Sequence, residues 1–104
     1  MRLAIASLLL LIASPASGEP VVGADCALNG FALRGDVQVV ESFPDITVQI
    51  VQSFPDLKVK RVENFPDDCG EWRFVESFPD FKIQIVSSFP DLKIEYVDSF
   101  PGLP

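Results

Sequence analysis

The stretch from Gly35 to Asp67 reads GDVQVVESFPDITVQIVQSFPDLKVKRVENFPD and carries one short pattern three times. In each copy, a segment of alternating apolar and polar residues leads into a Phe-Pro pair. The pattern returns in residues 70–102, GEWRFVESFPDFKIQIVSSFPDLKIEYVDSFPG. An internal repeat of this kind organises the whole chain, and it has to be interpreted before any single element of secondary structure.

The repeat has a regular period and divides into two halves. The Phe-Pro pairs are spaced by 11, 11, 13, 11 and 11 residues. Residues 37–67 align with residues 72–102 at an offset of 35, with 18 of 31 positions identical, and the longer spacing marks a joint between these halves. The pattern predicts six structural corners, at Phe43, Pro44 and Asp45; Phe54, Pro55 and Asp56; Phe65, Pro66 and Asp67; Phe78, Pro79 and Asp80; Phe89, Pro90 and Asp91; and Phe100, Pro101 and Gly102.

The segments between the corners are predicted to be strands. An 11-residue apolar period can specify a helical coiled coil, but a proline in every period would break such a helix. In residues 92–97, the side chains of Leu92, Ile94 and Tyr96 point to one side of a strand, and the three between them point to the other. The sequence therefore predicts a small all-β domain of six strand-plus-corner repeats with one apolar face.

The corners have to reset the alternation, because a period of 11 is odd and an unbroken strand would change face at every repeat. Proline restricts the backbone there, and aspartate or serine can bond to nearby backbone amides. We expect the phenylalanine of each corner to pack into the core.

The third repeat departs from this pattern. Arg61 stands at an apolar-face position where the second half has Tyr96, and Asp68 stands at another apolar position. The favoured interpretation is a sheet edge near the joint, where Arg61 reaches solvent or a carboxylate. The alternative is a polar pocket between the halves.

On general grounds, six short strands with corners suggest a small β-solenoid or a sandwich. The repeated Phe-Pro-Asp segments, with Gly70-Glu71-Trp72 at the joint, resemble the 7(1) septoil knot domain family over Gly35 to Gly102. This resemblance implies a small all-β domain whose backbone is deeply knotted as a seven-crossing torus knot. It implies no particular activity.

The N-terminus has the features of a secretory signal peptide. A positive start at Met1-Arg2 precedes an apolar run from Leu3 to Ala13, which is too short to span a bilayer. Small residues end the segment, so we expect cleavage after Gly18. The sequence thus predicts a signal peptide at residues 1–18, a leader at 19–36 and the six-repeat domain at 37–104. The protein would be exported to the periplasm or the extracellular space, with no membrane span in its mature chain.

Export permits a disulfide. The chain has two cysteines, so the pairing predicted is Cys26 with Cys69. Replacing both should lower stability without abolishing the repeat fold.

Composition argues against several function classes. The 104 residues include no histidine, which excludes a histidine-based catalytic triad. A formal charge of −7 disfavours non-specific nucleic-acid binding, which needs basic residues against phosphate. One aspartate per repeat is too few oxygen ligands for a calcium site. We expect no catalytic residues, no metal and no cofactor.

The outward strand face carries a row of basic residues, which could dock an anionic partner or could simply keep the sheet soluble. These residues are Lys58, Lys60, Arg73, Lys82 and Lys93. Two functions therefore remain open. The first is an exported, kinetically stable structural or interaction module that binds an unknown protein or envelope component. The second is a small secreted inhibitor or effector with one specific protein partner.

Overall fold

The computed structural model describes residues 20–104, so the predicted signal peptide lies outside the described residues. The described chain is all-β and has no helix that could cross a membrane. Its strands are β1 (Ala27–Leu28), β2 (Phe31–Ala32), β3 (Gly35–Val39), β4 (Ile46–Ile50), β5 (Leu57–Arg61), β6 (Glu71–Phe74), β7 (Phe81–Ile85) and β8 (Leu92–Tyr96).

Six of these strands form a closed barrel in the order β3-β6-β5-β8-β4-β7, and every neighbouring pair in it is parallel. The short strands β1 and β2 pair separately as an antiparallel hairpin. A closed barrel is neither the solenoid nor the sandwich suggested on general grounds. It also has no edge among its six strands, so the expected sheet edge beside Arg61 was wrong.

The interior of the barrel is filled by the apolar face that the alternation predicted. The first and second inward positions of β4 and β8, for example, are fully buried, whereas the third is not. The buried core residues on the barrel strands are Val37, Ile46, Val48, Leu57, Val59, Trp72, Phe81, Ile83, Leu92 and Ile94. Trp72 is the largest of them, and its ring meets that of Phe81 edge-on at 5.5 Å between centroids.

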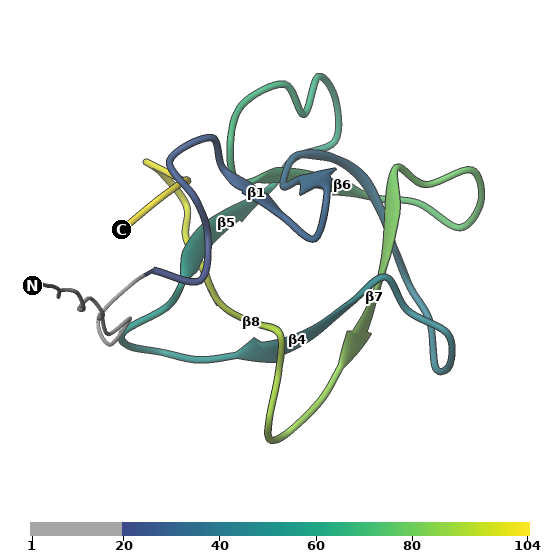
Figure 1. The fold of residues 1–104 in the computed structure, drawn as a ribbon. Helices are drawn as coiled ribbons and strands as arrows, with labels where there is room; N and C mark the ends of the chain where they lie inside the picture. The colour runs from purple at the N-terminus through teal and green to yellow at the C-terminus, as the bar shows by residue number, and fades with distance from the viewer. Residues whose placement is uncertain (1–19) are drawn as a thin grey trace, which may run out of the picture.

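Consecutive strands are mostly not neighbours in the barrel. Strands β3 and β4 lie on either side of β7, so residues 40–45 have to cross β7. By the same reasoning residues 51–56 cross β8, residues 75–80 cross β3 and residues 86–91 cross β4. Because the interior is filled with side chains, these corners pass on the outside, and Figure 1 shows the connections projecting outward around the ring of strands.

The leader covers one end of the barrel. Val22 and Leu33 are buried in the same core as the barrel strands, and the Leu33 carbonyl accepts hydrogen bonds from the Trp72 Nε1–H (3.1 Å) and the Gly70 N–H (3.0 Å). The predicted Cys26–Cys69 disulfide is confirmed, with 6.0 Å between Cα atoms. It ties the leader to the joint between the halves. The barrel itself begins at Gly35, slightly before the domain boundary drawn from the sequence.

Candidate functional site

In each of the four corners that cross a strand, the aspartate forms two hydrogen bonds with the backbone of the crossed strand. The Asp45 N–H donates to the Lys82 carbonyl (2.9 Å), and the Asp45 carboxylate accepts from the Lys82 N–H (2.8 Å). The same reciprocal pair joins Asp56 to Lys93, Asp80 to Asp36, and Asp91 to Thr47. The expectation that these aspartates bond to nearby amides was wrong. Their partners are distant in the chain because each corner lies on top of another strand.

The last corner makes the same connection without a carboxylate. Gly102 occupies the aspartate position, and its N–H donates to the Lys58 carbonyl while its own carbonyl accepts from the Lys58 N–H, both at 2.8 Å. A φ of 119° at Gly102 allows this arrangement, since L side chains rarely adopt such a backbone. Asp67 also differs, because the joint it belongs to connects two neighbouring strands and crosses none.

The six corner phenylalanines are the most exposed large apolar side chains on the described surface. Their exposed fractions run from 81% at Phe65 to 97% at Phe89. The prediction that they pack into the core was therefore wrong for all of them, namely Phe43, Phe54, Phe65, Phe78, Phe89 and Phe100. For the corners that lie over another strand, that strand separates the phenylalanine from the core. Phe65 belongs to the joint, which crosses no strand, and it shares the left-handed backbone of the other five. We call these six side chains the phenylalanine tips.

The backbone at every phenylalanine tip is left-handed, with φ between 53° and 57°. Such a conformation is uncommon for non-glycine residues, and a bulky aromatic is an unusual residue to hold it. It resets the strand alternation at each corner, as the odd period requires. The six tips thus combine a strained backbone with an exposed apolar ring, and strain of this kind often accompanies functional surfaces.

The end of the barrel opposite the leader is open and apolar. All barrel strands are parallel, so their third inward positions meet at this end. Four of these positions expose 36–51% of an apolar side chain, and Arg61 and Tyr96 complete the set. In barrel order the six residues, which we call the open end, are Val39, Phe74, Arg61, Tyr96, Ile50 and Ile85.

Arg61 and Tyr96 are paired within the open end. The Arg61 guanidinium lies over the Tyr96 ring, 4.2 Å from its centroid, which is a cation–π geometry. Burial raises the pKa of the Tyr96 hydroxyl, and the positive charge of Arg61 opposes that shift. Arg61 is exposed to solvent, as one interpretation of the sequence expected, although no sheet edge is present. It also borders a hollow of about 400 Å³ between strands of the two halves, lined by Lys60, Arg61, Tyr96, Val97 and Asp98, as the alternative expected. The contact with the Tyr96 ring was not anticipated from the sequence.

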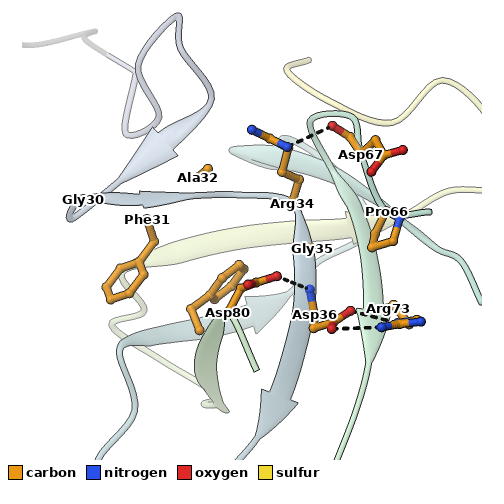
Figure 2. A pocket seen from close by; sticks show the side chains of 11 residues that line it. Gly30, Phe31, Ala32, Arg34, Gly35, Asp36, Pro66, Asp67, Arg73 and Asp80 are labelled. Atoms are coloured by element: carbon orange, nitrogen blue, oxygen red, sulfur yellow. Dashed lines mark hydrogen bonds and ion pairs between the residues drawn. The ribbon is translucent and has the colours of Figure 1, made fainter. Parts of the chain in front are cut away.

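A polar hollow of about 470 Å³ lies between the leader and the third corner (Figure 2). Arg73 donates from both Nε and an Nη to the Asp36 carboxylate, at 2.8 and 2.9 Å. This bonding holds the pKa of Asp36 below its usual range. Arg34 donates to the Asp67 carbonyl at 3.3 Å, and the Asp80 carboxylate accepts from the Asp36 N–H. The charged groups of the hollow are thus largely bonded to the protein itself.

The predicted basic row is interleaved with other side chains. Lys58, Lys60 and Arg73 lie beside Glu95, Glu71 and Asp36 on neighbouring strands. Lys82 and Lys93 lie beside Gln38 and Gln49. The barrel order also separates Lys82 from Lys93 by a whole strand, β4. The outward face is therefore mixed in charge, and the arrangement offers apolar contact at the tips and the open end more than it offers a cationic surface.

Comparison with known proteins agrees with the repeat pattern. The model of the 7(1) septoil knot domain matches residues 30–104. The chain belongs to this family. The chain is also similar to an uncharacterized Synechocystis protein, slr1025, with 73% identity over 48 residues. That alignment covers 46% of this chain and 43% of the Synechocystis protein, so the chain matches less than half of that relative's length.

Proposed function

We propose that this septoil knot protein is an exported, non-enzymatic structural or interaction module that contacts its partner through the phenylalanine tips. The observation that carries the proposal is the exposure of all six tips, each 81% or more. Large exposed apolar surfaces mark interaction sites, and here an exposed aromatic ring recurs at every one of the six corners. The hydrogen bonds at the corners hold the tips in place, so little ordering of the protein would accompany binding.

The disulfide supports the exported location, because such bonds persist mainly in oxidising compartments. The corner aspartates support a non-enzymatic role. Four of them share one environment, in which the carboxylate accepts a backbone N–H of the crossed strand. Paired catalytic carboxylates need environments that differ, so that one can act as an acid and the other as a base.

We further propose that the chain is knotted and that its durability is kinetic. The family assignment and the four corners that cross outside another strand support this proposal. To unfold, a knotted chain has to thread its ends out of the barrel, and slow unfolding would suit a protein without chaperone rescue. Refolding should include a phase of ~10–100 s that a prolyl isomerase accelerates and a slower one that it leaves unchanged. Complete refolding within milliseconds would contradict the knot.

The test of the interaction role is capture from an envelope extract with the disulfide-bonded protein, run beside a variant with Phe43, Phe54, Phe78 and Phe89 changed to Ser. We expect the variant to keep its far-ultraviolet spectrum and to lose the captured component. A matched variant in which four exposed corner serines, Ser42, Ser53, Ser77 and Ser88, become Ala should still capture it. Equal capture by the protein and its phenylalanine variant would refute a role for the tips. One partner bound with 1:1 stoichiometry would favour the inhibitor or effector alternative.

A further inference from the structure

The open end presents an apolar surface that no part of residues 20–104 covers. Beneath it the second inward positions are fully buried, so the surface is shallow and rests on a filled core. Hollows of about 360 Å³ between Val39 and Phe74 and about 380 Å³ between Ile50 and Tyr96 interrupt it. These are places where apolar side chains of a partner could insert.

A third, more polar hollow of about 400 Å³ lies beside Arg61 and Asp98. Glu76 also lines the hollow between Val39 and Phe74, so an acidic group stands beside the apolar side chains there.

The opposite end shows what kind of segment covers an end of this barrel. There the leader inserts Leu33, which is fully buried, and the next residue is Arg34. The Arg34 guanidinium stays exposed and bonds to the backbone carbonyl of Asp67 in the neighbouring corner. The covering arrangement that the molecule itself contains is thus one apolar side chain pointing inward, followed by one exposed basic side chain that bonds to a backbone carbonyl of the neighbouring corner.

The charges around the open end also favour a partner with basic side chains. At this end, four of the six strands are followed by an exposed acidic residue, which stands two positions after the last residue of the strand. These residues are Glu41, Glu63, Glu76 and Asp98. Arg61 of the open end offsets only one of these four negative charges. The edge therefore keeps an excess of negative charge, which attracts positive charge and repels a second copy of this acidic protein.

We propose that the open end binds a short basic segment of another protein, in which large apolar side chains alternate with Lys or Arg. The apolar side chains contact the open end, and the basic ones face the four acidic residues at its edge. This surface is separate from the phenylalanine tips, and its occupancy does not depend on them.

The probe is a fluorescein-labelled eight-residue peptide of alternating Lys and Leu, titrated with the purified disulfide-bonded protein and followed by fluorescence anisotropy. We expect saturable binding that weakens as salt rises, because exposed charges are screened. Peptides with Glu in place of Lys, or with Ser in place of Leu, should bind at least about tenfold more weakly.

Two double variants separate the open end from the tips. The first, Ile50→Gln with Ile85→Gln, removes two half-exposed apolar groups from the open end and should weaken binding about tenfold. The second, Phe54→Gln with Phe89→Gln, removes two apolar groups from the corners that follow the same two strands and should leave binding unchanged. Replacing Glu41 and Glu76 with Gln should flatten the dependence on salt.

Three results would overturn the proposal. One is equal loss of binding in the two double variants, and another is equal binding of the Lys and Glu peptides. The third is a protein dimer in sedimentation analysis that dissociates when Ile50 and Ile85 are replaced, because the occupant would then be a second copy. A failure of the tips to capture a partner would leave these measurements unaffected.

Discussion

The two ends of the barrel are built from the same repeat and differ in what covers them. At the end that the leader covers, which we call the closed end, Phe81 is 1% exposed and packs beside Trp72 and beside Phe31 of the leader. At the open end, Phe74 also meets Trp72 edge-on, at 6.2 Å, yet is 36% exposed. The contrast teaches that inward orientation alone does not bury a side chain in this fold. A covering segment is needed at each end.

Truncating these two phenylalanines should change the stability of the fold by clearly different amounts. Phe81→Ala should lower the free energy of unfolding by about 3–5 kcal/mol, as for a fully buried aromatic. Phe74→Ala should lower it by about 1–2 kcal/mol, because part of its surface is already in water. Denaturant unfolding with the disulfide intact measures both. Equal losses would show that the open end is covered in solution.

The disulfide that ties the leader to the joint provides the next prediction. Changing Cys26 and Cys69 to Ser should cost about 2–4 kcal/mol, because the unfolded chain is no longer constrained across a separation of 43 residues. Hydrogen exchange should then show earlier opening at the closed end, in the leader and around Trp72, than at the open end. Uniform loss of protection over the whole barrel would contradict the view of the leader as a separate cover.

The phenylalanine tips should contribute far less to stability than the residues at either end. Phe89→Ala should change the free energy of unfolding by less than about 1 kcal/mol, because the side chain is 97% exposed and gains little from folding. Asp91→Ala in the same corner should cost more, because the Thr47 N–H would lose its carboxylate partner. Denaturant midpoints of the two variants give the ranking, and the reverse order would contradict it.

The smallest expected effect is a change in the pKa of Tyr96 at the open end. Burial raises the folded-state pKa of the Tyr96 hydroxyl above its ordinary value of 10.0. The neutral hydroxyl therefore contributes fully to stability below pH 10.0, and this contribution is lost as the pH rises through the folded-state pKa. Arg61→Gln should raise this pKa further, because the nearby positive charge favours tyrosinate. The absorbance of the single tyrosine reports it directly. Arg34→Gln at the closed end is the control and should leave the pKa unchanged.

Local pattern was enough to predict the strands and the disulfide. Inward positions such as Ile46 and Leu92 follow from an alternation that does not depend on which strands pair. The Cys26–Cys69 bond follows from two cysteines and expected export. The open end could have been located only in part: Ile50 and Ile46 are the same residue type on the same face, and no local signal says that one is covered and the other is not.

The amino-acid sequence establishes that this chain is a repeat of short strands, where each strand turns, and which face of each is apolar. Period and residue type act within a few residues, and so they can be read locally. The closing of the strands into a parallel barrel, with corners that cross outside other strands, is visible only in the folded molecule. That crossing turned the phenylalanines of the crossing corners outward and paired the four aspartates of these corners with distant amides. The partners of a corner depend on which strand lies beneath it.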